Sequence, residues 1–236
     1  MIASEEALPI ISPDWPAPSG VKAIITCAST TDAPVNVTRA AEFGHYGPYN
    51  LALHVGDNAA KVNAFREQLA GQAQVANWQW LNQVHGIEVI KAHKLASAPN
   101  ADASFTQQKQ LACAILTADC LPVLFCNQQG TQVAAAHAGW RGLAAGVLEA
   151  TCQTFLPDDK ILAYLGPAIS QKAFEVGAEV KAAFEQVMGR EASDCFSPNP
   201  VNAGHYYADL YALARIRLTR LGVKSISGGQ DCTFSN

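Results

Sequence analysis

The stretch TADCLPVLFCNQQGTQVAAAHAGWRG, residues 117–142, decides how the middle of this chain folds. Two apolar runs flank a polar segment that ends in glycine, which is a signal for a β-hairpin. If Asn127–Gly130 forms the loop, Cys126 faces Thr131, and counting outward places Cys120 opposite His137. Directly opposed side chains of an antiparallel pair share one face, with Cβ atoms about 4.5–5.5 Å apart. The stretch therefore predicts a thiol beside an imidazole.

Two features qualify this count. A slip of one residue would send the two side chains to opposite faces, so the match carries information. Pro122 lacks a backbone donor and favours a sheet edge or a bulge near Cys120.

A third candidate ligand is His85, in the segment Leu81-Asn-Gln-Val-His85-Gly. Two imidazoles and a thiol are a good ligand set for zinc, with one tetrahedral position left for water or substrate. His85 must arrive from a separate strand end, which the hairpin count does not place. If His85, Cys120 and His137 converge, we expect a metal-dependent enzyme.

The segment Gly139-Trp-Arg-Gly142 follows His137, and a helical pattern begins near Leu143. A strand, a glycine-bearing turn and a helix start form an arrangement that binds anions. Arg141 can grip two oxygens of such an anion, or it can close a salt bridge instead. Asp119, beside Cys120, is a candidate general acid or base if buried, and otherwise caps a turn.

Composition excludes several classes of protein. The chain has 236 residues, of which 49% are apolar and 15% charged, with a net charge of −4. We expect one domain over residues 1–236, with no nucleic-acid partner because no concentrated basic face is present. No run reaches the 18 apolar residues of a membrane span, and the acidic N-terminus does not resemble a secretory signal. Seven scattered cysteines are typical of reduced thiols, so we expect a cytoplasmic protein.

Hydrophobic periodicity predicts several strands and helices after an irregular lead-in and a long loop over residues 27–50. The expected strands are Val21–Thr26, Trp78–Val84, Glu88–Lys91, Leu111–Leu116, Pro122–Phe125, Gln132–His137 and Ile161–Leu165. The expected helices run from Asp57 or Asn58 to Leu69, stopped by Gly71, and over Leu143–Phe155, Gly177–Met188 and Ala208–Leu221. Strands outnumber the crossovers of a simple βαβ series, so the fold class is α/β (α+β) with mixed sheets covered by helices.

The motifs around the three candidate ligands resemble those of one family. They are Leu81-Asn-Gln-Val-His85-Gly, Ala101-Asp-Ala103, Thr117-Ala-Asp-Cys120-Leu-Pro, Ala136-His137-Ala-Gly-Trp-Arg-Gly, Leu165-Gly-Pro-Ala-Ile and Phe174-Glu-Val-Gly-Ala-Glu-Val. In consistent order over about residues 50–232, they resemble the YfiH-like family, also called the laccase-domain or multicopper polyphenol oxidoreductase family.

The resemblance implies a four-layer α/β/β/α fold, similar to the catalytic domain of cytotoxic necrotizing factor. It implies zinc held by His85, Cys120 and His137. It also implies purine nucleoside phosphorylase activity on adenosine, inosine and methylthioadenosine, with adenosine deaminase activity alongside. The chain departs from the family at Asn50-Leu-Ala52, where members carry Asn-Leu-Gly after a Gly-Gly-Val-Ser loop; Asn50 is either a turn former or a substrate contact.

Three other functions stay open. Cys120 and His137 can be the nucleophile and base of a cysteine hydrolase or deamidase without metal. A copper-dependent polyphenol oxidase is weaker, because one Cys and two His cannot supply several copper centres. A non-catalytic zinc-binding protein is the third. The expected partners are a purine nucleoside and phosphate, with no membrane, and the expected state is a monomer or small homo-oligomer.

Overall fold

The computed structural model describes residues 7–28, 46, 49–93 and 97–235. The chain divides into two compact units, one comprising Met1–Pro13 and Ala23–Asn77, the other Asp14–Lys22 and Trp78–Asn236. Most of the long loop expected over residues 27–50 lies outside the described residues, as do residues 1–6 of the acidic N-terminus. A single catalytic domain over residues 1–236 stays a prediction.

Among its described residues, the first unit contains one strand pair and one helix. Strand β1 (Ile10–Ile11) pairs antiparallel with β2 (Ile25–Thr26), which is only the end of the expected strand. Helix α2 (Ala59–Ala73) begins as expected at Asn58, whose side chain accepts hydrogen bonds from two backbone N–H groups. The predicted stop at Gly71 was wrong. A glycine weakens a helix without breaking it, and α2 ends where Gln74 takes a left-handed conformation.

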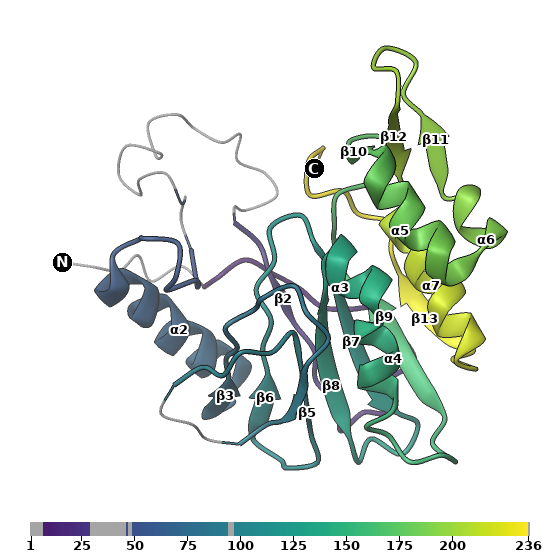
Figure 1. Ribbon diagram of the computed structural model, residues 1–236. Coiled ribbons are helices and arrows are strands. Elements are labelled where there is room, and N and C mark those ends of the chain that lie inside the picture. The colour runs from purple at the N-terminus through teal and green to yellow at the C-terminus, as the bar shows by residue number, and fades with distance from the viewer. Residues whose placement is uncertain (1–6, 29–45, 47–48, 94–96, 236) are drawn as a thin grey trace. The chain divides into compact units, whose positions relative to one another are not determined.

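The second unit is built on a six-stranded sheet of order β13-β9-β7-β8-β5-β4 (Figure 1). Its strands are β4 (Val89–Lys91), β5 (Ala103–Thr106), β7 (Leu121–Asn127), β8 (Val133–Ala138), β9 (Ile161–Leu165) and β13 (Ser225–Gly228). The β13–β9 and β4–β5 pairs are parallel and the three others antiparallel, so the sheet is mixed. Strands β7 and β8 are almost wholly buried because they lie at its centre.

The β7–β8 hairpin forms, but its register differs from the prediction by two residues. Pro122, not Cys120, pairs with His137, because Thr131 joins the turn. The Asn127 side chain accepts hydrogen bonds from the backbone N–H groups of Thr131 and Gln132 and so closes a longer turn. Because side chains alternate with a period of two, this shift leaves Cys120 and His137 on the same face.

Three helices pack with this sheet: α3 (Trp140–Ala145), α4 (Val147–Cys152) and α7 (Leu210–Arg220). Figure 1 shows α3 and α4 over β7 and β8. The predicted helix over residues 143–155 was wrong in two respects. It begins at Trp140, and Gly146, at a φ of 111°, divides it.

A buried arginine ties these helices together. The Arg217 Nε of α7 donates to Glu149 Oε1 of α4 at 2.7 Å, and its Nη1 donates to the carbonyl oxygen of Ala144 at the end of α3. The ion pair therefore holds the two halves of the divided helix against α7.

Two small sheets complete the unit. One has the order β10 (Glu175–Gly177), β12 (His205–Ala208) and β11 (Phe196–Pro198), accompanied by α5 (Ala178–Met188) and α6 (Arg190–Ser193). The other pairs β3 (Asn77–Gln79) with β6 (Leu111–Cys113). The predicted helix from Gly177 to Met188 is confirmed.

The predicted mixed α/β class is confirmed, while the four-layer arrangement and the likeness to cytotoxic necrotizing factor stay predictions. Within the described ranges, no helix is both long and apolar enough to cross a membrane.

Candidate metal centre

Three side chains that are far apart in the sequence converge in the second unit. The ligand atoms of His85, Cys120 and His137 all lie within 4.8 Å of one another. Cys120 Sγ lies 3.8 Å from His85 Nε2, and the rings of His85 and His137 meet edge to face, 4.7 Å between centroids. The predicted convergence is therefore present in the structure, and it supplies two nitrogens and one sulfur.

His137 is the buried member of the set. It lies near the end of β8, its side chain is 3% exposed, and its Nδ1 lies 2.8 Å from Asp102 Oδ1. Burial lowers the pKa of His137, while the hydrogen bond with Asp102 and the charge of Asp102 act in the opposite direction. A neutral ring whose Nδ1 donates to Asp102 keeps the lone pair of Nε2 free for a ligand.

Cys120 is half-buried and directly precedes β7. Burial raises the pKa of its thiol, and the charges of Asp119 and Asp102 raise it further. A metal ligand must be the thiolate. A cation bound beside Cys120 offsets both causes, because it is an opposite charge next to the sulfur.

His85 is exposed and has an unusual backbone. Its φ of 59° lies in the left-handed region, which a residue other than glycine adopts at a cost of about 1–3 kcal/mol. The backbone N–H groups of His85 and Gly86 both donate to the carboxylate of Asp102, at 2.9 and 2.7 Å. The buried carboxylate of Asp102 therefore stabilises this backbone conformation.

Two glycines of the Gly139-Trp-Arg-Gly142 segment make room for this arrangement. A Cβ on Gly139 would lie 2.8 Å from His85 Cδ2 and 3.0 Å from Cys120 Sγ, and one on Gly142 would lie 2.8 Å from the carbonyl oxygen of Gly86. The start of α3 thus packs directly against two of the candidate ligands.

The side chain of Gln83 joins the segments that carry His85 and Cys120. Its Nε2 donates to the carbonyl oxygen of Leu116, and its Oε1 accepts from the N–H of Leu116, both at 2.7 Å. This pair of bonds mimics one rung of a β-ladder and fixes one loop relative to the other.

The three donor atoms fit zinc. A tetrahedral zinc with bonds of about 2.0–2.1 Å to nitrogen and 2.3 Å to sulfur places two nitrogens roughly 3.3 Å apart and a nitrogen and a sulfur roughly 3.6 Å apart. The separation of 3.8 Å between Cys120 Sγ and His85 Nε2 is close to this value, and the ligand nitrogen of His137 lies within 4.8 Å of both atoms. Across the part of the chain that the structure describes, this is the one such group of three or more His, Cys, Asp or Glu residues.

For the other predicted site residues, Asp119, Arg141 and Asn50, the contacts seen in the structure are with residues other than the three ligands. Asp119 is exposed and accepts a hydrogen bond from Thr233, so the burial that an acid–base role assumed is not met. Arg141 is exposed, and its guanidinium stacks on the Trp140 ring at 4.4 Å. Asn50 belongs to the first unit, where its side chain bonds with Ala52 and Asp57, as a turn former does.

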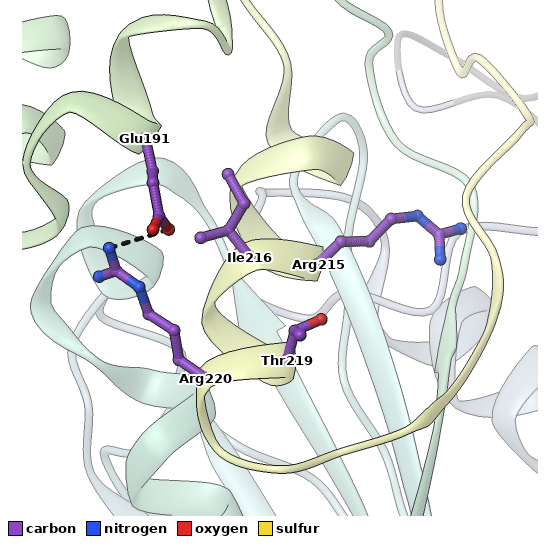
Figure 2. A pocket seen from close by; sticks show the side chains of 5 residues that line it. All are labelled: Glu191, Arg215, Ile216, Thr219 and Arg220. Atoms are coloured by element: carbon purple, nitrogen blue, oxygen red, sulfur yellow. Dashed lines mark hydrogen bonds and ion pairs between the residues drawn. The ribbon is translucent and has the colours of Figure 1, made fainter.

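A surface pocket elsewhere in the second unit is a weaker candidate for a functional site. Figure 2 shows it between α6 and α7, lined by Glu191, Arg215, Ile216, Thr219 and Arg220. Arg220 pairs with Glu191, and Arg215 donates to the carbonyl oxygens of Ile226 and Gly228. Both arginines already have partners, and the helices that line the pocket carry none of the three ligands.

Sequence reasoning gave no role to Asp102 or Gln83. Both lie in motifs that carried the family resemblance, but neither is a ligand type that draws attention in isolation. A weak signal was available for Asp102, because a carboxylate flanked by Ala101 and Ala103 needs hydrogen-bond partners if that segment is buried. Gln83 had no such signal, since its bond with Leu116 depends on how two loops meet.

Comparison with known proteins gives consistent matches. The sequence model of the family described as multi-copper polyphenol oxidoreductase laccase matches residues 35–236. A purine nucleoside phosphorylase of Pseudomonas aeruginosa is 46% identical over 229 residues, 96% of this chain and 88% of that protein. Purine nucleoside phosphorylase YfiH of Escherichia coli K12 is 45% identical over 229 residues, 96% of this chain and 89% of that protein.

Two crystal structures are similar in fold. That of the Neisseria meningitidis protein NMB0706 matches with a TM-score of 0.84 and 45% identity, covering 95% of this chain and 88% of that one. That of YlmD from Geobacillus stearothermophilus matches with a TM-score of 0.70 and 29% identity, covering 78% and 75%.

Proposed function

Because the chain belongs to the multi-copper polyphenol oxidoreductase laccase family, in which relatives at 45–46% identity are named purine nucleoside phosphorylases, we propose that it is a purine nucleoside phosphorylase. We expect it to act on adenosine, inosine and methylthioadenosine with phosphate, and to deaminate adenosine as well. The observation that carries the proposal is the convergence of His85, Cys120 and His137 beside the start of α3.

In phosphorolysis, a phosphate oxygen attacks C1′ of the sugar. The bond from C1′ to the purine nitrogen breaks with its electron pair on the base, and the base takes up a proton. We assign phosphate binding to Arg141, whose exposed guanidinium can bind two oxygens at once. Asp119 adjoins Cys120 and accepts a hydrogen bond from Thr233, but it is exposed, so a proton-delivery role for it stays a prediction.

The same residues support a metal-assisted deamination. His85, Cys120 and His137 would hold zinc, with copper as the weaker alternative. A bound zinc supplies a Lewis acid and lowers the pKa of water toward about 7, which provides the nucleophile that deamination requires. The chain's own part is to orient both imidazoles and to bring the Cys120 sulfur within 4.8 Å of them.

The sequence also supports proposals about location, oligomeric state and partners. We propose a cytoplasmic enzyme, a monomer or small homo-oligomer, that takes small-molecule substrates and binds no nucleic acid. The net charge of −4 supports the last point. A substrate contact at Asn50 stays a prediction.

The test is incubation of the purified protein with adenosine, with and without phosphate, followed by chromatography of the products. We expect adenine and ribose 1-phosphate only when phosphate is present, and inosine from deamination in either case. Cys120→Ala is expected to remove both activities, whereas Cys126→Ala, at a buried thiol outside the site, is the control. Absence of adenine at every phosphate concentration would contradict the phosphorylase assignment.

Metal analysis separates the remaining alternatives. A cysteine hydrolase needs Cys120 within reach of an imidazole base, and the Cys120 sulfur lies 3.8 Å from His85 Nε2 and within 4.8 Å of the ligand nitrogen of His137, so distance alone does not separate the two readings. Stoichiometric zinc that is lost in Cys120→Ala supports the metal assignment, whereas a metal-free thiol trapped by iodoacetamide supports the hydrolase. Bound zinc without turnover of any nucleoside would indicate a metal-binding protein.

A further inference from the structure

One buried carboxylate connects two of the candidate ligands. Asp102 directly precedes β5 and is 0% exposed. Its Oδ1 contacts His137 Nδ1 at 2.8 Å and the backbone N–H of His85 at 2.9 Å. Its Oδ2 accepts from the N–H groups of Gly86, at 2.7 Å, and Val84, at 3.2 Å. All four hydrogen bonds of this carboxylate are therefore made with a candidate metal ligand or with a residue next to one in the sequence.

On the His137 side, the contact selects one form of the ring. An ionised carboxylate only accepts hydrogen bonds, so Nδ1 of His137 must carry the proton. Nε2 of His137 is then unprotonated, and its lone pair is available to a metal ion shared with His85 and Cys120. A carboxylate behind a metal-binding histidine acts in this way in metal sites generally.

On the His85 side, the contact holds the backbone. Three successive N–H groups, from Val84 to Gly86, converge on Asp102, and the middle residue, His85, has a left-handed φ. Without the acceptor, three donors would lose their partner and the backbone could relax to an ordinary conformation. The His85 ring would then move away from Cys120.

We propose that Asp102 is the positioning residue of the metal centre, which it assembles before a metal binds. One carboxylate sets the tautomer of His137 and the loop conformation of His85 together, so that both imidazoles face the sulfur of Cys120. The inference rests on the proposed metal site.

The variant Asp102→Asn tests the proposal. Asparagine has the same shape but one acceptor oxygen, and its amide group would face two N–H donors, so about half of the hydrogen bonds are lost. We expect zinc affinity, measured by competition with a chromogenic chelator, to fall about 10–100-fold. The visible spectrum of the cobalt-substituted protein should change as well, because the ligand geometry changes.

The control is Asp209→Asn. Asp209 also accepts a backbone N–H, that of Ala212 at the start of α7, but it contacts no candidate ligand. We expect its zinc affinity and cobalt spectrum to match the wild type. Equal zinc affinities and cobalt spectra in the wild type and both variants would overturn the proposal.

A measurement on the metal-free wild type needs no variant to fold. Long-range proton–nitrogen NMR correlations at pH 8 should show His137 as the single Nδ1–H tautomer, and the exposed His85 should have a slowly exchanging backbone N–H. An Nε2–H tautomer, or unprotected exchange at both His85 and Gly86, would overturn the proposal. These results do not depend on nucleoside turnover, so failure of the phosphorylase assay would leave them interpretable.

Discussion

Gly139 shows how a single hydrogen in place of a methyl group shapes the centre. Its φ of −60° is open to any residue, so the glycine is not required for backbone conformation. The requirement is space, since a Cβ there would lie closer to His85 and Cys120 than side chains tolerate. The glycine lets α3 begin against the ligands themselves.

We therefore expect Gly139→Ala to weaken zinc binding roughly tenfold or more while the fold survives, because the two ligand side chains must move apart. Zinc competition and thermal unfolding of the same preparations check this. Gly71→Ala is the matched control. It has no atom within 4 Å of the added Cβ, lies inside α2, and is expected to stabilise the protein by about 0.5–1 kcal/mol. An unchanged zinc affinity in Gly139→Ala would contradict the packing argument.

Among the elements, the β7–β8 hairpin depends on the side chain of Asn127. This side chain is 2% exposed, accepts from Thr131 and Gln132, and donates to Thr131 Oγ1 and Asp159. The Asn127 side chain therefore replaces several backbone hydrogen bonds inside the turn. It also sets the register in which His137 pairs with Pro122.

Asn127→Ala should lower the free energy of unfolding by about 2–3 kcal/mol, because buried donors lose their partner. Urea unfolding measures the loss. Gln128→Ala, at the exposed neighbouring position, should change it by about 0.5 kcal/mol or less. Similar losses in the two variants would show that the turn does not depend on Asn127.

The elements that could be predicted are those with a long apolar run or a clear helix start. Strand β9 was predicted at its observed bounds, and Asn58 caps α2 as expected. Short strands such as β5 and β13 were missed, because they contain few apolar residues and exist through pairing with distant partners. Gly146 and Gly71 look alike in sequence, but only Gly146 adopts a left-handed conformation and divides a helix.

For the protein in its entirety, the buried thiols predict how stability depends on pH. Burial raises the pKa of Cys126 from 9.0 to about 11, and raises that of Cys152 from 9.0 to about 12, with a smaller contribution from Glu149. In the unfolded chain both thiols ionise near pH 9, so between that pH and 11–12 the folded protein binds more protons. Their contribution is fully present below pH 9 and is lost as pH rises.

We expect the free energy of unfolding to fall by about 1 kcal/mol per thiol between pH 9 and pH 10. Urea unfolding in the presence of a reductant, at pH 8, 9 and 10, checks this. In Cys126→Ala the free energy of unfolding should fall by about 1 kcal/mol less over the same pH range, because one of the buried thiols is absent. An identical decline in the variant would assign the alkaline loss to other groups.

Local pattern was enough to identify the mixed α/β class, the hairpin, the starts of α2 and α5 and the three ligand types, because each depends on neighbours along the chain. The convergence of Cys120 and His137 was predicted despite an incorrect register, since an even shift preserves the face of a strand. The position of His85, the role of Asp102 and the space at Gly139 were decided by tertiary structure. Each of these depends on hydrogen bonds or contacts between segments 17 to 54 residues apart, and such contacts have no local signature.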